Sequence, residues 1–366
     1  MRRVPGLIAA RLAACREHMA RSRLSAYLVT RHVDQLYLTG FSGEDGAVVV
    51  TPETVFIITD GRFAEQATRE TPWARRIVRK KGINDELARL RKRLRWRRIG
   101  FQADHVTVAQ ASLLRKAVRP AGLVRAGPIV NDLRLAKDDE EIAAIRRAVR
   151  VAEEAFVATR RAIRIGMTER QIAARLEYEM IKRGAAGSAF PTIVAEGRNS
   201  SLPHARPGDR RVHEGSILLI DWGAVVGHYR SDLTRVLFVR RIPPRFRRMY
   251  SAVCEAQRRA ILAVRAGVGP RAVDRAARSY LQSAGFGKAF VHATGHGLGL
   301  DVHEVPSLSR RTRAPLRAGM VVTVEPGVYV PGLGGVRIED DVLVTQDGAE
   351  VLTTLSKDLD DMVIRG

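Results

Sequence analysis

An internal repeat in the second half of the chain is the feature that most restricts its fold. Gly166 and Gly184 enclose one segment with helical spacing, and Gly267 and Gly285 enclose a second segment of the same length. Each segment follows a longer helical stretch and leads into apolar sequence typical of strands. A duplicated unit of helices and strands predicts a domain whose two halves are related by pseudo-two-fold symmetry.

The length and the placement of glycine and proline predict two domains. A chain of 366 residues is long enough for two domains of roughly 150 residues each. Residues 118–128 are rich in glycine and proline and show no clear period, which is typical of an inter-domain junction. We therefore expect a small α/β domain over residues 1–130 and a larger domain over residues 131–366.

Apolar periodicity predicts the main elements of both domains. In the first domain we expect helices over 5–22 and 86–94, and strands over 26–30, 46–51 and 54–59. The second domain begins with a long helix over 137–163, in which apolar residues recur every three or four positions. Gly166 is expected to end this helix as a glycine cap.

The cysteine content and the apolar pattern restrict the compartment. The two cysteines, Cys15 and Cys254, form neither a disulfide framework nor a CxxC metal site, so we expect free thiols in a reducing compartment. Arginines interrupt the N-terminal region where a secretory signal would need an apolar stretch. No run of about 18 apolar residues, the length of a membrane span, occurs in the sequence. We expect a soluble cytoplasmic protein that does not engage a membrane.

The formal net charge of +23 raises the question of a nucleic-acid partner. Arginines greatly outnumber lysines and are spread along the whole chain, a bias that genome base composition can produce without function. The densest basic stretch, at 91–98, reads as a solvated helix end. We therefore do not expect nucleic acid to be a partner.

Two aspartates occupy strands that a short turn joins. Asp221 ends the apolar strand SILLIDWG, and Asp232 lies on the next strand, HYRSDLTRVLF. If Val226 and Gly227 form a two-residue hairpin loop, the two aspartates are directly opposed, with Cβ atoms about 4.5–5.5 Å apart. Opposed carboxylates in an apolar setting repel each other, and a metal ion would neutralise them. The alternative is two solvent-facing acids that pair with nearby arginines.

Two glutamates repeat this arrangement near the C-terminus. Glu325 ends the strand MVVTVE, Glu339 lies on the strand GVRIEDDVLV, and the two are symmetric about Gly332. A hairpin would therefore oppose them, and the period of two places Arg337 and Asp341 on the same face as Glu339. Because Glu325 ends a valine-rich strand that is expected to be buried, it requires a partner, and simple surface ion pairing is disfavoured.

A histidine-rich loop follows the second repeat. HATGHGLGLDVHE, at 292–304, brings His292, His296 and His303 together among glycines. Glycine lets the backbone approach closely and leaves room around an imidazole ring. His292 and His296 have the i,i+4 spacing of a helical zinc pair, but the glycines disfavour a helix here. We expect a functional loop in which these two histidines do not bind one ion from a helix.

One histidine from this loop and the four acids form an oxygen-rich set of potential ligands. Such a set disfavours a structural zinc site, which prefers cysteine and histidine, and suits adjacent divalent ions bridged by carboxylates. We expect two divalent ions per subunit, Mn²⁺ first, with Co²⁺, Zn²⁺ and Fe²⁺ as alternatives. Such a pair holds a bridging water of lowered pKa, which is a nucleophile for amide hydrolysis.

Six motifs carry a resemblance to a known family. In chain order they are LPHARPGD, LLIDWGA, YRSDLTR, HATGHGLGLDVHEVP, TVEPGVY and VRIEDDVLVT. From about residue 132 onward the sequence resembles the pita-bread metallopeptidases, in particular Xaa-Pro aminopeptidases and prolidases. YLTGFSGEDGAVVVT and TDGRF are similar to the creatinase-type N-terminal domain of these enzymes. The resemblance implies an α+β pita-bread catalytic domain, a curved sheet backed by helices, after a small α/β domain. It also implies a homodimer or larger homo-oligomer, in which the N-terminal domain shapes a neighbour's pocket.

The resemblance assigns the ligand roles position by position. It implies five metal ligands: Asp221, Asp232, His296, Glu325 and Glu339. The residue that matches Glu325 also takes the proton of the attacking hydroxide. All five positions carry the expected residue type, although Trp222 is a less usual neighbour of Asp221.

Other positions match groups that contact substrate. His204 and His303 match histidines that hold the substrate and stabilise the tetrahedral oxyanion, and His292 matches a further active-site histidine. Arg337 matches an arginine that orders the site and, in prolidases, contacts the proline carboxylate. Tyr329 matches a tyrosine near the pocket.

The activity implied by the resemblance is hydrolysis of the bond between an N-terminal residue and a following proline, with a metal-bridging hydroxide attacking the scissile carbonyl. We expect an Xaa-Pro aminopeptidase that acts on peptides with proline second, and an Xaa-Pro dipeptidase, or prolidase, is the alternative. A hypothesis from another class is a catalytically silent protein on the same fold that binds nucleic acid or another partner. A creatinase, which uses the fold without metal, is a further alternative. The complete ligand set argues against both.

Overall fold

The computed structural model describes residues 4–365, which divide into two compact units with the boundary between Arg134 and Leu135. The boundary expected at residue 130 falls within helix α6 (Ile129–Arg134). The expected junction at 118–128 is partly a strand, β6 (Gly122–Ala126), which pairs in parallel with β5 (Arg98–Gln102). The glycine and proline content of this segment does not predict a strand. Pairing at the edge of a sheet depends on tertiary contacts, which local composition does not indicate.

The first unit is built around a mixed sheet. The strand order is β4 (Arg75–Val78), β3 (Val55–Thr59), β2 (Gly46–Val50), β1 (Ala26–Val29), β5, β6. The central strands β1, β2 and β3 pair antiparallel, and the outer neighbours pair in parallel. The strands expected over 26–30, 46–51 and 54–59 are therefore confirmed, with the pair β2–β3 forming the hairpin.

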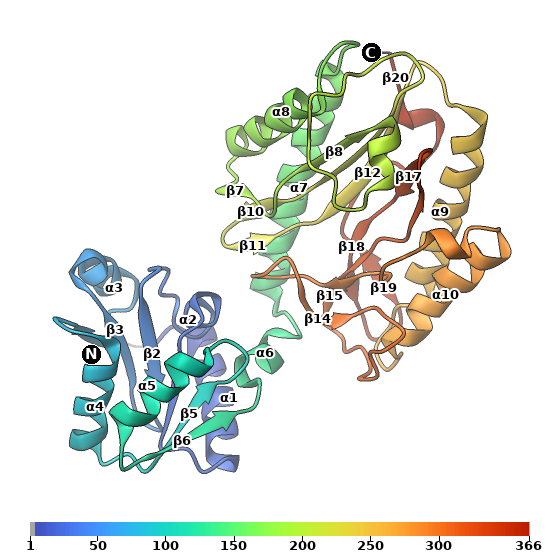
Figure 1. Ribbon diagram of the computed structural model, residues 1–366. Coiled ribbons are helices and arrows are strands. Elements are labelled where there is room, and N and C mark those ends of the chain that lie inside the picture. The colour runs from blue at the N-terminus through green and yellow to red at the C-terminus, as the bar shows by residue number, and fades with distance from the viewer. Residues whose placement is uncertain (1–3, 366) are drawn as a thin grey trace. The chain divides into compact units, whose positions relative to one another are not determined.

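Helices accompany this sheet between its strands (Figure 1). They are α1 (Gly6–Arg21), α2 (His32–Thr39), α3 (Ala64–Glu70), α4 (Ile83–Leu94), α5 (Val108–Val118) and α6. Leu87 and Leu90 of α4 and Leu114 of α5 pack in one buried cluster with strand residues such as Phe56 and Phe101. The unit is thus a small α/β domain, as expected.

Both cysteines are free, as expected, and we predict that they react slowly in the folded protein. Burial raises the pKa of the Cys15 thiol to about 12 and that of Cys254 to about 11. Because the thiolate is the reactive form, an aromatic disulfide reagent at about pH 8 should modify both thiols fully only after denaturation in guanidinium. Rapid modification of Cys15 in native protein would contradict its burial within α1.

The second unit contains two helix pairs that follow the internal repeat. The first is α7 (Asp139–Ala162) with α8 (Glu169–Lys182), and the second is α9 (Pro244–Ala263) with α10 (Pro270–Ser283). The members of each pair pack on each other. Figure 1 shows the first pair (green) on one side of the strands and the second pair (yellow to orange) on the other.

The repeat glycines share one backbone conformation. Gly166, Gly184, Gly267 and Gly285 have φ values of 92°, 95°, 83° and 86°, in the left-handed region that favours glycine. The expected role of Gly166 as the cap of α7 is wrong, because α7 ends at Ala162 and Ile163 turns into extended backbone with its side chain buried. Gly166 instead lies in the turn that leads into α8. The pseudo-two-fold arrangement itself is confirmed.

Two larger sheets lie between the helix pairs. One has the order β20 (Val363–Ile364), β12 (Leu233–Val239), β9 (Ile217–Trp222), β8 (Ile193–Glu196). The other has the order β14 (Glu304–Ser307), β13 (His296–Gly297), β15 (Val321–Val324), β18 (Asp340–Val344), β19 (Ala349–Val351). An isolated bridge between Thr234 and Glu339 joins them. The smaller sheets are β11 (Tyr229–Arg230), β10 (Ala224–Val226), β7 (Gly187–Ser188) and the hairpin β16 (Gly327–Val330), β17 (Gly334–Arg337).

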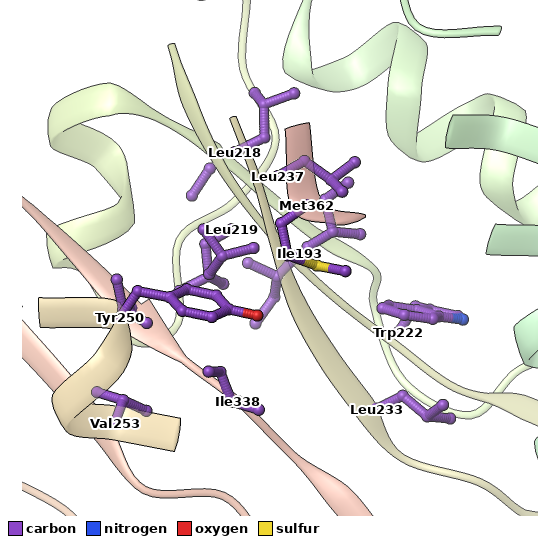
Figure 2. Close-up of a cluster of buried hydrophobic side chains, with 14 of the residues drawn as sticks. Ile193, Leu218, Leu219, Trp222, Leu233, Leu237, Tyr250, Val253, Ile338 and Met362 are labelled. Atoms are coloured by element: carbon purple, nitrogen blue, oxygen red, sulfur yellow. The ribbon is translucent and has the colours of Figure 1, made fainter. Parts of the chain in front are cut away.

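One large apolar core supports these sheets. Figure 2 shows Leu218, Leu219 and Leu237 of β9 and β12 among the buried side chains that gather there. Trp222 is fully buried, stacks on Phe156 of α7 with 4.5 Å between ring centroids, and donates its indole N–H to the Ala152 carbonyl. The unusual tryptophan beside Asp221 therefore packs β9 against α7. Within the described residues, no helix has the length and apolar character that crossing a membrane requires.

Candidate metal centre

A cavity of about 530 Å³ opens in the second unit where its two larger sheets meet. Nine of the ten residues predicted for the site line it: His204, Asp221, Asp232, His292, His296, His303, Glu325, Arg337 and Glu339. Tyr329, the tenth, reaches the site through its hydroxyl, which lies 2.9 Å from His292 Nε2. The rest of the lining is mostly apolar, with Phe190, Ile193 and Val302 among it, and also includes Arg206 and Ser307.

The aspartate pair reaches the cavity in a register different from the expected one. The hairpin loop is Gly227–His228, where both residues have positive φ (57° and 72°), as a type I′ turn requires. Asp221 is therefore opposite Thr234 rather than Asp232. Asp232 precedes Thr234 by two positions, so the alternation of a strand keeps it on the same face as Asp221. The expected direct opposition is wrong, and the aspartates are diagonal neighbours instead.

The glutamate pair follows the predicted register. Thr323 and Val324 pair with Asp341 and Asp340, and Gly327 pairs with Arg337 farther along the same two segments. Glu325 and Glu339 lie between these two paired regions. The same register places them opposite each other. The hairpin symmetry about Gly332 is therefore confirmed.

His296 presents one ring nitrogen to the acids. Its Nδ1 lies 3.0 Å from the Gly297 carbonyl, which only accepts, so Nδ1 carries the proton. Nε2 lies 3.6 Å from Asp232 Oδ2 and 3.4 Å from Glu325 Oε1. Burial lowers the pKa of His296, which favours the neutral ring with a free lone pair on Nε2. The loop is not helical at 292–296, as expected, and a Cβ on Gly295 would lie 1.9 Å from the Thr323 carbonyl oxygen.

The acids fit a divalent cation. Ligand atoms of Asp232, His296 and Glu339 all lie within 4.8 Å of one another. Asp221 Oδ1 is buried without a hydrogen-bond partner. Burial, and then repulsion from neighbouring carboxylates, raises the pKa of Asp232 and of Glu339 well above the ordinary range. Burial also raises the pKa of Glu325. Buried, mutually repelling oxygen donors beside an imidazole nitrogen are a donor set for a hard or borderline divalent metal.

Arg337 is buried and bound mainly by protein groups. It is 3% exposed and donates from Nε to Thr234 Oγ1 at 3.1 Å. Nη1 donates to the Tyr329 hydroxyl at 2.6 Å and to the Pro203 carbonyl at 3.3 Å, and Nη2 pairs with Asp221 Oδ2. This arginine orders the site, as the resemblance implies. Four of its five N–H groups are in these hydrogen bonds, so one N–H of Nη2 is left for the expected contact with a substrate carboxylate, and a contact through two parallel N–H groups would break one of these bonds.

The two remaining histidines lie toward the opening. His204 is exposed, and the ring of His303 lies 4.3 Å from the ring of His296. Burial and the neighbouring His296 lower the pKa of His303. A neutral imidazole can donate a hydrogen bond to a carbonyl oxygen without leaving a second charge near the metal ligands.

Two threonines at the site are not among the residues that the sequence motifs predict. Thr234 donates to Glu339 Oε2 at 2.6 Å, and Thr323 Oγ1 accepts the His296 backbone N–H at 3.0 Å. Both orient candidate ligands from behind. The alternation of side chains along a strand could have indicated them. Thr234 follows Asp232 by two positions and Thr323 precedes Glu325 by two, so each threonine shares a face with a candidate ligand.

Comparison with known proteins identifies the family. Residues 143–346 match metallopeptidase family M24. The chain belongs to this family. Residues 11–136 match the creatinase/prolidase N-terminal domain. This M24 chain is therefore a hydrolase with the fold that its motifs predicted, and the family implies divalent metal ions.

Individual M24 relatives cover almost the whole chain. An Xaa-Pro dipeptidase structure from Bacillus anthracis has a TM-score of 0.93 and 35% identity, and the match covers 98% of this chain and 100% of that one. An Xaa-Pro dipeptidase from Pyrococcus horikoshii is 33% identical over 94% of this chain and 96% of its own. An X-Pro aminopeptidase structure from Thermotoga maritima has a TM-score of 0.89 and 36% identity, covering 95% of this chain and 100% of that one.

Proposed function

We propose that this M24 peptidase is an Xaa-Pro dipeptidase that hydrolyses the bond between an N-terminal residue and a C-terminal proline. The observation that carries the hydrolytic part is the convergence of five candidate metal ligands on one cavity. The dipeptidase part is supported by the B. anthracis and P. horikoshii relatives, both named for this activity. The Xaa-Pro aminopeptidase that we first expected becomes the alternative, favoured by the T. maritima structure.

We propose that Asp221, Asp232, His296, Glu325 and Glu339 hold two divalent ions. When bound, such ions supply Lewis acidity and lower the pKa of a water, which makes it a nucleophile near neutral pH. Support comes from the unpartnered Oδ1 of Asp221 and from the mutual repulsion of the acids, which a cation would relieve. We expect Mn²⁺ first, with Co²⁺, Zn²⁺ and Fe²⁺ as alternatives.

The remaining side chains are assigned to substrate and proton handling. Glu325 is placed on the cavity wall, where its carboxylate takes the proton of the attacking water and delivers it to the leaving nitrogen. His204 and His303 donate hydrogen bonds to the carbonyl oxygen as negative charge develops on it. His292 is held by the Tyr329 hydroxyl and by the Ala293 carbonyl, so it supports this wall of the cavity.

The test compares a dipeptide with a longer peptide. Purified protein loaded with Mn²⁺ is expected to hydrolyse Ala-Pro at least about tenfold more efficiently than Ala-Pro-Ala, a difference of about 1.4 kcal/mol in transition-state free energy. Faster release of alanine from Ala-Pro-Ala would favour the aminopeptidase. If the purified protein binds no divalent metal and hydrolyses no Xaa-Pro peptide, the enzymatic proposal is wrong. The hypothesis of a catalytically silent binding protein would then be favoured.

Oligomeric state and compartment stay predictions. A homodimer is expected from the resemblance, and light scattering coupled to gel filtration tests it. A cytoplasmic location is expected from the sequence pattern, with fractionation of the source cells as the measurement.

A further inference from the structure

The cavity contains a second arginine whose charge is not used by the protein. Of the described residues that line it, Arg206 and Arg337 are the arginines. Arg337 is buried and has four of its five N–H groups bonded to the protein, so one N–H of Nη2 remains. Arg206 is exposed and makes no side-chain hydrogen bond or ion pair in the described structure. Arg206 is therefore an unpaired cation at the cavity, whereas Arg337 is bound to the residues that form the cavity wall.

The backbone around Arg206 is anchored on both sides. Ala205, which precedes it, is buried and donates its N–H to the Leu202 carbonyl at 3.1 Å. Gly208, two residues later, donates its N–H to Glu169 Oε2 at 2.8 Å. The intervening Pro207 restricts Arg206 to extended backbone. An unpaired guanidinium on an anchored segment is placed to receive a ligand with little loss of backbone entropy.

The burial of the acids at the bottom of the cavity restricts how a substrate can be oriented in it. Asp232 and Glu339 are buried, so the scissile carbonyl has to reach the floor of the cavity. The proline that follows the scissile bond lies about one residue length, roughly 3.5 Å, farther along the chain. In a dipeptide that proline ends in a carboxylate. Arg206, two residues after His204, lines this cavity and is exposed, as a side chain that meets a carboxylate at the solvent side of the cavity must be.

We propose that Arg206 binds the C-terminal carboxylate of the dipeptide substrate and thereby determines the preference for dipeptides. This inference rests on the proposed dipeptidase function. It reassigns a contact that the family resemblance implied for Arg337. Guanidinium matches a carboxylate through two parallel N–H donors, so Arg206 recognises charge and shape together.

The experiment compares Ala-Pro with its C-terminal amide, which lacks the carboxylate charge. In the Mn²⁺-loaded Arg206→Gln variant, kcat/KM for Ala-Pro is expected to fall on the order of tenfold through KM, the size of one charge-assisted hydrogen bond. Hydrolysis of Ala-Pro amide should be unchanged, and Arg206→Lys should restore part of the preference. Added salt should weaken the preference of the parent protein and leave Arg206→Gln unaffected, because an exposed ion pair is screened.

A matched control is Arg198→Gln. Arg198 is exposed, lies in the preceding 3₁₀ segment Gly197–Ser201 and does not line the cavity, so this variant changes the net charge equally. Unaltered discrimination in Arg206→Gln, or an equal loss in Arg198→Gln, would overturn the assignment while leaving a dipeptidase. If the parent protein prefers Ala-Pro-Ala or Ala-Pro amide, the dipeptidase proposal itself fails, and the assignment of Arg206 fails with it.

Discussion

Asp232→Asn and Glu339→Gln are each expected to lower kcat/KM for Ala-Pro by at least about a thousandfold, because each removes a charge that we propose holds the divalent ions. Elemental analysis of the purified variants should show less than the parent's metal content. The exposed acid Asp347 provides a matched control, and Asp347→Asn should retain both metal and turnover. Normal turnover in either site variant would contradict a two-metal mechanism.

The same variants are expected to be more stable than the parent after metal is removed. Asp232 and Glu339 are buried beside other carboxylates, whose repulsion raises their pKa values. Replacing one by a neutral amide of similar size removes that repulsion in the metal-free protein. A higher melting temperature in chelator, together with lost activity, separates loss of the site from misfolding. A lower melting temperature would show that these carboxylates stabilise the fold without metal.

Metal removal is expected to produce the second large effect, a pH-dependent loss of stability. The pKa values of Asp232 and Glu339 are higher in the folded protein than in the unfolded chain, so between those values the folded protein binds more protons. The free energy of unfolding of the chelated protein therefore falls as pH rises above about 4, and the loss is complete above the folded pKa values. Acidification should restore stability until other groups titrate.

Mn²⁺ should reverse this loss at neutral pH. A ligand at about 100 to 1,000 times its dissociation constant stabilises the folded state by about 3–4 kcal/mol, which corresponds to a rise of roughly 10 °C in melting temperature for a domain of this size. Differential scanning calorimetry at several pH values, with chelator or with Mn²⁺, measures both effects. The assignment of these acids as metal ligands would be contradicted if the melting temperature in chelator rises with pH. It would also be contradicted if Mn²⁺ does not change the melting temperature.

The two acid pairs of this M24 chain differ in how closely their hairpins follow the register expected from the sequence. Glu325 and Glu339 were placed opposite each other from their symmetry about Gly332, and the ladders on both sides keep that register. For Asp221 and Asp232 the expected turn was displaced by one residue, because His228 adopts positive φ. Histidine enters this region less readily than glycine, so Val226–Gly227 was the natural choice. The displacement changed the opposed partner of Asp221, but the period of two kept both aspartates on one face.

The sequence by itself determined the repeat, the two-domain organisation, the helix pairs and the residue types of the site. Those features depend on local periodicity and on motifs that neighbouring residues encode. Only the tertiary structure decided that β6 pairs at the sheet edge and that Thr234 supports Glu339 from another strand. It also showed that protein groups bind Arg337 and that Arg206 makes no side-chain hydrogen bond or ion pair in the described structure. The physical reason is that hydrogen bonding and burial depend on which distant segments of the chain come into contact. The sequence of one segment does not indicate which other segments it will contact.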